Sequence, residues 1–150
     1  MRIRRYKSSD LEEVSKLIQK TYGCFNKNEG SRESVRRYIE NFSTKNSNIH
    51  NVEKKFQSTP IFYVAVDNQQ IIGMVRGNQN RIFNLFVKGS QHRKGIGKAL
   101  VEEFERKAKN SGSDEIKVKA SIYATPFYEK LGYVKTTGIR NIHGLKIQPM

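Results

Sequence analysis

Residues 85–100, LFVKGSQHRKGIGKAL, join an apolar, strand-like run to an amphipathic helix through a basic turn that contains glycine. A helix leaves its first backbone N–H groups unpaired and carries partial positive charge at that end, so this junction predicts an anion site. Gly95 and Gly97 lack a Cβ atom and let the backbone approach an anion. Four basic side chains surround the turn: Lys88, Arg93, Lys94 and Lys98. The stretch predicts a phosphate site, although an ordinary strand-to-helix loop with solvated basic residues has the same pattern.

Two familiar nucleotide-binding motifs do not fit this turn. A Walker A loop needs Ser or Thr after its Gly-Lys pair, but Gly97 and Lys98 are followed by Ala99. The dinucleotide fingerprint G-x-G-x-x-G requires a final glycine, which is Leu100 here, and it normally follows the first strand of a chain. Nucleotide hydrolysis and hydride transfer are therefore disfavoured.

Size and composition indicate one globular domain over residues 1–150. With 36% hydrophobic residues the chain can bury a core, although a mean hydropathy of -0.70 indicates a very polar surface. The 28 Lys and Arg residues exceed the 14 Asp and Glu residues, which gives a formal charge of +14. Such a charge favours encounter with nucleic acids, anionic membrane surfaces or phosphorylated cofactors, and does not by itself choose among them.

The remaining compositional signals concern compartment and metals. A single cysteine, Cys24, excludes an internal disulfide and fits a reducing compartment. The N-terminal residues MRIRRY lack the apolar core of a signal peptide, and no apolar run approaches the roughly 18 residues of a spanning helix. We therefore expect a cytoplasmic protein with no membrane partner. The three histidines are too scattered to predict a metal site.

Hydrophobic spacing predicts four helices. Ser9 and Glu12 form a capping-box pattern for a first helix through Tyr22, and Ser31 caps a second one through Phe42. A third helix follows the glycine turn from residue 96 to a stop near residue 112, and a short one begins with Thr125 as its cap. The polar, Asn-rich residues 44–58 are expected to form a loop.

Alternating or apolar runs predict the strands. They are expected at residues 2–6, 61–66, 71–77, 81–87, 115–121, 133–137 and 145–147, with a turn over residues 138–144. Strands and helices interleave without an internal repeat or a linker. The fold class is therefore α/β (α+β), with one mixed sheet and helices on both of its faces.

The order of these elements resembles the GNAT family of acetyl-CoA-dependent N-acetyltransferases. The segment HRKGIGKAL, after LFV, is similar to the family's (Gln/Arg)-x-x-Gly-x-(Gly/Ala) motif, which binds the pyrophosphate of acetyl-CoA. The later segment ASIYATPFYEKLGY resembles the family's strand and helix ending in F-Y-x-x-L-G-(F/Y). One departure is His92, which stands where the family has Gln or Arg. The family binds pyrophosphate mainly through backbone N–H groups, so CoA binding is still expected.

The resemblance implies a mostly antiparallel central sheet whose two central strands splay apart to hold pantetheine. Phe86 and Val87 would offer backbone groups to pantetheine, one N–H would polarise the thioester carbonyl, and Ser121 would add a side-chain contact. A surface strand-end hydroxyl is the alternative for Ser121. The cofactor-binding residues implied are Leu85, Phe86, Val87, His92, Arg93, Lys94, Gly95, Ile96, Gly97, Lys98, Ser121 and Tyr128.

Tyr128 matches the family's tyrosine that protonates the departing CoA thiolate. A phenol with a pKa of about 10 is protonated at neutral pH and can donate to a thiolate whose conjugate acid has a pKa of about 8.5. Packing on the core beside Phe127 and Leu131 is the alternative. The base that deprotonates the amine stays open. No His or Glu lies on the LFV strand, and its nearest polar side chain, Asn84, is a poor base. The candidates are therefore Glu29, His143, Tyr22 or a chain of waters.

The function predicted is direct transfer of acetyl from acetyl-CoA to a primary amine, with no metal. A covalent route through Cys24 is disfavoured because no base is predicted beside it. Two alternatives are a basic nucleic-acid-binding module and a catalytically inactive CoA sensor. The first is disfavoured because aromatic residues such as Phe42 and Phe104 have core spacing. The class of acceptor and a possible homodimer are left open.

Overall fold

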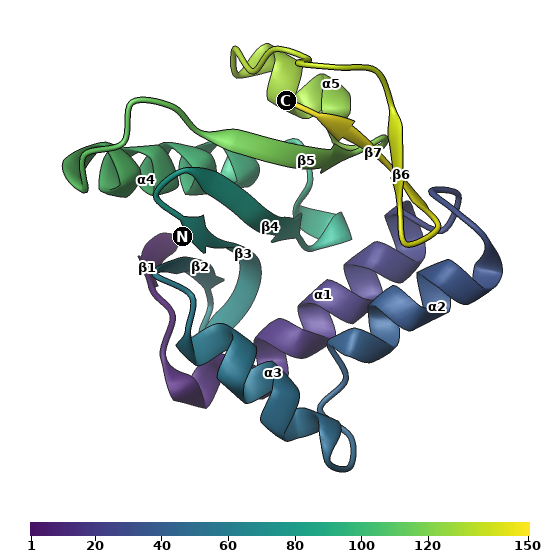
Figure 1. The fold of residues 1–150 in the computed structure, drawn as a ribbon. Coiled ribbons are helices and arrows are strands. Elements are labelled where there is room, and N and C mark those ends of the chain that lie inside the picture. Colours follow the sequence, from purple (N-terminus) through teal and green to yellow (C-terminus); the bar gives the residue numbers. More distant parts are fainter.

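One mixed sheet of seven strands runs through the computed structural model, which describes residues 1–150 (Figure 1). Its strand order is β1-β2-β3-β4-β5-β7-β6, and only the β4–β5 pair is parallel. The strands are β1 (Arg2–Arg5), β2 (Ile61–Asp67), β3 (Gln70–Asn78), β4 (Arg81–Val87), β5 (Lys117–Ser121), β6 (Arg140–Ile142) and β7 (Leu145–Pro149). The predicted class, a mostly antiparallel mixed sheet with helices on both faces, is confirmed.

Helices cover both faces of this sheet (Figure 1). The α-helices are α1 (Leu11–Phe25), α2 (Arg32–Asn41), α3 (Asn48–Gln57), α4 (Ile96–Asn110) and α5 (Thr125–Lys130). Short 3-10 turns, η1 (Ser8–Asp10) and η2 (Gly89–Gln91), precede α1 and α4. None of the helices combines the length and the apolar composition that a membrane crossing requires.

The side chains of β2 point alternately to the two faces of the sheet and so divide the core into two clusters. Tyr63 and Ala65 face α4 and pack with Leu100, whereas Phe62 and Val64 face α1 and α3. Successive side chains of a strand point to opposite faces, so a run that is apolar at every position is buried from both sides. The sheet is thus a central layer, and its free edges rather than its faces are available for a site.

The two central strands β4 and β5 separate soon after they meet. They pair only at Arg81 with Lys117 and at Ile82 with Val118. On its other edge β4 stays paired with β3 as far as Val87. The part of β4 after Ile82 therefore has no hydrogen-bonded neighbour on its β5 side, which confirms the predicted splay.

The largest error of the sequence prediction is helix α3, which occupies most of the expected loop at residues 44–58. Ile49, Val52 and Phe56 lie at helical spacing, and Val52 and Phe56 are fully buried against the sheet. Tertiary burial of this narrow apolar face outweighs the turn-forming Asn and Ser residues around it.

Three smaller corrections concern one strand and the caps of two helices. Residues 133–137 form no strand, and strand β6 lies instead in the expected turn region. Ser9 lies inside η1, so the expected capping box is absent and Asp10 is the N-cap of α1. Thr125 lies inside α5, whose N-cap is Ala124. The cap at Ser31 is confirmed, because its hydroxyl accepts a hydrogen bond from the Ser34 N–H at 3.1 Å.

The β6–β7 hairpin reaches across to the connection between α1 and α2 (Figure 1). Lys146 N–H donates to the Glu29 carbonyl at 2.7 Å, and Gly30 forms an isolated antiparallel bridge with Leu145. These contacts join the second half of the sheet to the helices of the first half. They close one end of the gap between β4 and β5.

Candidate functional site

The turn before α4 presents a row of free backbone donors. The six N–H groups of residues 93–98 donate to no protein acceptor, and the first bonded amide is Ala99, which donates to the Gly95 carbonyl at 3.0 Å. Gly95 is the N-cap of α4 with φ 80°, and Arg93 also has a positive φ of 63°. Two left-handed residues in one short turn gather these N–H groups at the positive end of a 15-residue helix. This arrangement suits an anion with several oxygen atoms.

The charges around this turn are almost all positive. Arg93, Lys94 and Lys98 are exposed, and Lys94 donates only to the Gln91 amide oxygen at 3.3 Å. The one ion pair formed by a basic residue of the turn joins Lys98 to Glu102 at 3.9 Å, and both side chains are exposed. Such an exposed pair is weak, so the basic side chains remain available to an anion.

The two glycines of the turn have different roles. A Cβ on Gly95 would have no atom within 4 Å, so this residue is needed for its left-handed φ and leaves the turn open. A Cβ on Gly97 would lie 3.1 Å from the ring of Phe127, so this glycine lets α5 pack closely against α4. The sequence predicted close approach of an anion at both positions, which stays a prediction; the structure adds a backbone reason at Gly95 and a packing reason at Gly97.

His92 connects this turn to the end of β4. Its Nε2 atom lies 2.6 Å from the Val87 carbonyl oxygen. Its ring also packs against Phe25 at the end of α1, with a centroid distance of 4.7 Å, and Phe25 packs against Tyr123 at 5.2 Å. These three rings span the gap between the turn that follows β4 and the turn that follows β5.

Backbone groups of β4 that face the gap belong to alternate residues. Lys88 N–H donates to the Ile72 carbonyl of β3, and Phe86 lies opposite Met74 in the same ladder. Peptide groups alternate in direction along an antiparallel pair, so those of Leu85 and Val87 point away from β3 and into the gap. The expectation of Phe86 and Val87 as backbone contacts therefore shifts to Leu85 and Val87, while the Phe86 ring packs toward α1.

A cavity of about 170 Å³ lies between the splayed strands. It is lined by Leu85 and Phe86 of β4, Ser121 of β5 and Tyr128 of α5, together with residues of α1, α2 and β7. The structure thus brings together the strand, the serine and the tyrosine that the sequence singled out. The phosphate-type turn lies just beyond the open end of β4.

Tyr128 is 3% exposed, yet its hydroxyl makes no hydrogen bond within the protein. Only the Ser15 hydroxyl is a fully buried side-chain polar atom without a partner. The Tyr128 hydroxyl also lacks a partner, so it is not fully buried, and Tyr128 lines the cavity. Burial raises the pKa of Tyr128 above its usual value. The phenol is therefore held as a neutral donor with its proton uncommitted.

Ser121 has a structural role as well as a place in the cavity wall. Its Oγ accepts from the Ala124 N–H at 3.0 Å, and its carbonyl accepts from the Thr125 hydroxyl at 2.9 Å. These bonds order the turn that carries α5. The Ser121 hydroxyl proton remains free to donate to a ligand.

The candidate bases are dispersed. Glu29 is buried and accepts from the N–H groups of Ile122 and Tyr123 and from the Asn26 amide, which makes it a structural support of the α5 turn. His143 is exposed at the tip of the β6–β7 hairpin and does not line the cavity. The structure thus provides no base in direct contact with the cavity at these two positions.

Tyr22 lines the cavity and stacks on Tyr38 at a centroid distance of 3.8 Å. Burial, with a contribution from Glu29, raises the pKa of Tyr22 to about 12, which makes it a poor base at neutral pH. Cys24 is exposed on α1 and does not line the cavity.

Sequence reasoning missed a chain of polar side chains at one end of the cavity. Asn84 donates from its amide nitrogen to the Tyr38 hydroxyl at 3.0 Å, and its oxygen accepts from Arg76 Nε at 2.7 Å. The available signal was an arginine inside an apolar strand, in the sequence IIGMVRG. A charged residue in such a run is buried and therefore needs partners.

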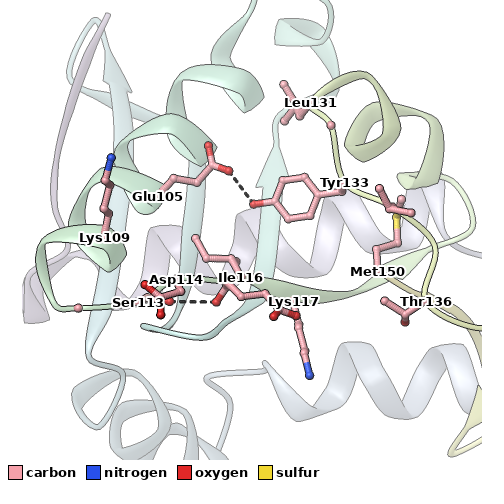
Figure 2. Close-up of a pocket in the computed structure, with 14 residues that line it drawn as sticks. Glu105, Lys109, Ser113, Asp114, Ile116, Lys117, Leu131, Tyr133, Thr136 and Met150 are labelled. Atoms are coloured by element: carbon pink, nitrogen blue, oxygen red, sulfur yellow. Dashed lines mark hydrogen bonds between the residues drawn. The ribbon is translucent and has the colours of Figure 1, made fainter.

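A larger, open hollow of about 850 Å³ lies at the C-terminal end of α4 (Figure 2). Tyr133 points across it and donates to Glu105 at 3.0 Å, and burial together with this carboxylate raises the pKa of Tyr133. None of the residues that the sequence predicted for the site lines this hollow. Its tyrosine is already bonded, so the cleft between β4 and β5 is the better candidate site.

Comparisons with known proteins agree with this geometry. The sequence matches the acetyltransferase (GNAT) domain over residues 26–150. A GCN5-related N-acetyltransferase from Rhodopseudomonas palustris is 19% identical, with a TM-score of 0.84 over 99% of this chain and 92% of that chain. The PaiA N-acetyltransferase of Thermoplasma acidophilum, solved in complex with coenzyme A, is 20% identical, with a TM-score of 0.74 over 99% and 96%. An aminoglycoside 6'-N-acetyltransferase, also complexed with coenzyme A, is 18% identical, with a TM-score of 0.72 over 99% and 95%.

At these identities the solved structures establish a shared fold. The family match adds sequence evidence, and it extends from the end of α1 to the last residue. It includes the basic turn, both splayed strands and α5. With the splay, the free N–H groups and the family match together, the chain belongs to the GNAT acetyltransferase family.

Proposed function

We propose that this chain is an acyl-CoA-dependent N-acetyltransferase that transfers acetyl from acetyl-CoA directly to a primary amine. The observation that carries the proposal is the row of free N–H groups at residues 93–98, placed where the bare edge of β4 ends. When bound, acetyl-CoA supplies the acetyl group as an activated thioester. The residues present fit that substrate in three parts.

The turn fits the pyrophosphate. Backbone N–H groups at a helix N-terminus bind phosphate oxygens, and Arg93, Lys94 and Lys98 would add charge-assisted contacts around them. Ile96 is buried in the α4 core cluster and would contribute its N–H alone. The strongly positive surroundings would also raise the local concentration of an anionic substrate.

The bare edge of β4 fits pantetheine. Leu85 and Val87 point their peptide groups into the gap. The Val87 carbonyl already accepts from His92, so the Leu85 groups and the Val87 N–H are those that an amide-bearing chain could pair with as an additional strand. An N–H from this edge would donate to the thioester carbonyl oxygen as negative charge develops on it. The Ser121 hydroxyl, on the opposite wall, would add a donor to the same chain.

Tyr128 fits the role of general acid. Its hydroxyl has no partner in the protein and remains protonated at neutral pH, so it can donate to the sulfur as the thiolate leaves. The amine would attack as the neutral species, and its proton would leave through water in the cavity, since Glu29 is occupied by three donors.

The experiment is thermal unfolding with and without acetyl-CoA, followed by CoA release with a panel of primary amines. At about 100 times its dissociation constant, acetyl-CoA should stabilise the folded chain by roughly 2.7 kcal/mol. No stabilisation at millimolar acetyl-CoA would refute the proposal. Stabilisation without CoA release from any amine would instead identify an inactive CoA-binding protein.

A further inference from the structure

Arg76 is a buried cation without a carboxylate partner. It lies near the end of β3, it is 7% exposed, and none of the ion pairs in the structure includes it. Its Nε donates to the Asn84 amide oxygen and its Nη1 to the Thr59 hydroxyl, both at 2.7 Å. Both partners are neutral. They satisfy hydrogen bonds but leave the positive charge uncompensated.

The guanidinium still has a free donor. Its Nη2 makes no hydrogen bond. The only fully buried side-chain atom without a partner is the Ser15 hydroxyl, so Arg76 Nη2 retains some exposure to solvent. The rings of Phe56 and Phe83 flank the group, with their centroids 5.4 and 5.5 Å from Cζ. Two hydrogen bonds and two rings thus hold the planar head of Arg76, and one of its terminal nitrogens is left without a partner and not completely buried.

A second cation accompanies Arg76. Lys55 of α3 is half-buried, its ammonium lies 4.4 Å from the centroid of the Phe42 ring, and it also forms no ion pair. Thr59 connects the two residues, because its hydroxyl accepts from Arg76 and donates to the Lys55 carbonyl at 2.8 Å. Burial lowers the pKa of Arg76 to about 10, and burial and the charge of Arg76 lower the pKa of Lys55. Arg76 therefore remains charged at neutral pH.

Buried charges in proteins are normally paired, because removal of an ion from water without a counterion costs several kcal/mol. Two neighbouring cations without a carboxylate are therefore unfavourable in the free protein. An anion that bound beside them would lower that cost. Arg is the side chain best suited to planar, bidentate contacts with carboxylate or phosphate.

This pair of cations adjoins the candidate active site. Asn84, which accepts from Arg76, lines the cavity between β4 and β5, and so do Phe83 and Tyr38. Along β4, Asn84 is followed by Leu85, whose peptide groups face the gap. An acceptor molecule could thus reach the cavity with its amine while another part of it contacts Arg76.

We propose that Arg76 and Lys55 bind the carboxylate of the acceptor, so that the acceptor is a primary amine of the amino acid type; a preference for phosphate in the titration below would contradict this choice of anion. This inference rests on the proposed acetyltransfer, but the anion site is defined by its own residues. Amines without an anionic group would then be poor substrates.

The first test is a titration of the protein, saturated with CoA, with sodium acetate, inorganic phosphate and neutral acetamide at constant ionic strength. The readout is the Nε–H resonance of Arg76 in ¹H–¹⁵N spectra. We expect a saturable shift with acetate that is tighter than any shift with phosphate, and none with acetamide. Absence of a shift with both anions would overturn the proposal.

Charge variants on one helix supply the control. Lys55→Gln should weaken anion binding roughly fivefold, whereas Lys54→Gln, which removes an exposed charge from the same helix, should leave it unchanged. Equal effects of the two variants would show a general effect of net charge and would overturn the site. Lys55→Gln is preferred to a change at Arg76, because Arg76 also holds Thr59 and Asn84 together.

The second test uses pairs of acceptors that differ only in charge, namely amino acids and their α-amides. We expect the wild-type kcat/KM to be roughly tenfold higher for the acids, and Lys55→Gln to reduce that ratio. Equal rates for acids and amides would contradict the inference while leaving acetyltransfer intact. If acetyl-CoA fails to stabilise the chain, the proposed function fails, and the Arg76 titration, repeated without CoA, still reports on the anion site alone.

Discussion

The His92 imidazole donates its Nε2–H to the Val87 carbonyl oxygen, at an N···O distance of 2.6 Å. The direction follows from chemistry, because a carbonyl oxygen only accepts and the ring nitrogen must therefore carry the proton. The bond joins the last residue of β4 to the start of the basic turn. One side chain thus fixes the spacing between the proposed pantetheine edge and the proposed pyrophosphate turn.

Removal of this bond should weaken acetyl-CoA binding without unfolding the chain. We expect His92→Ala to raise the Kd about fivefold, the effect of one hydrogen bond, and His92→Gln to restore much of the loss, because its amide can donate to Val87. Calorimetric titration provides the measurement. His143→Ala, at the exposed hairpin tip, is the control, and a Kd for His92→Ala equal to that of this control would contradict the role of the bond.

Gly95 and Gly112 offer a matched pair at the two ends of α4. Both have a positive φ, 80° and 94°, and a Cβ at either position would have no atom within 4 Å. Each change to Ala should therefore cost about 1 kcal/mol of stability from backbone strain alone. Only Gly95→Ala should also weaken acetyl-CoA binding, since it distorts the donor turn. Equal Kd values for the two variants would exclude the turn as the pyrophosphate site.

Tyr128→Phe should lower kcat at least about 100-fold where chemistry limits the rate, and leave the Kd for acetyl-CoA nearly unchanged. The reason is that the variant loses the proton donor and retains the buried ring. Because burial raises the pKa of Tyr128 above 10, Tyr128 should still be protonated near pH 10, and the wild-type rate should not fall there through its ionisation. Tyr133→Phe removes a hydroxyl that is bonded to Glu105 outside the cleft and should keep its activity. Full turnover by Tyr128→Phe would remove Tyr128 from the mechanism.

The pair formed by Arg4 and Asp10 should make stability depend on pH. Burial raises the pKa of Asp10, but hydrogen bonds from Arg4 and the Lys7 N–H outweigh it, and the net pKa lies below the usual value. The folded chain thus binds this proton less readily than the unfolded chain. The stabilisation is complete above the unfolded pKa and is lost as the pH falls through the lower folded value.

Asp10→Asn should therefore cost about 2 kcal/mol in urea unfolding at pH 7, and the difference from the wild type should shrink below about pH 4. Asp114→Asn, at an exposed position, should be neutral at both pH values. A cost for Asp10→Asn that stays constant down to pH 3 would show that packing, and not charge, makes residue 10 important.

Most of the fold could be predicted because its strands carry strong local signals. The run at β2 is apolar on both faces, and Ile96, Leu100, Phe104 and Ala108 of α4 are all buried as their spacing indicates. Helix α3 could not be recognised in the same way. Its apolar face is narrow, with only Val52 and Phe56 buried. The helix is stabilised by contact with the sheet, and the spacing of residues in the sequence does not reveal that contact.

The candidate site was predictable in its parts but not in its assembly. The glycine turn and Tyr128 stand in recognisable motifs. The structure places Tyr128 in the wall of the cavity and the turn beyond the end of β4. The choice of Leu85 and Val87 as the backbone contacts depends on strand register, which the sequence does not specify. Arg76 and Lys55 come from different elements, and their proximity arises only when α3 packs on β3.

The seam between β4 and β5 also affects how the chain opens. Only two ladder positions join the half-sheet β1–β4 to the half-sheet β5–β7. The other links are the side chains of the shared core and the contacts of Glu29 and Gly30 with the second half. Amide hydrogens of β5 and β7 should then exchange through separation of the halves, before global unfolding exposes those of β2 and β3. A ligand that fills the bare edge with its own amides would close this route. The acyl donor would thereby turn two cooperative units into one.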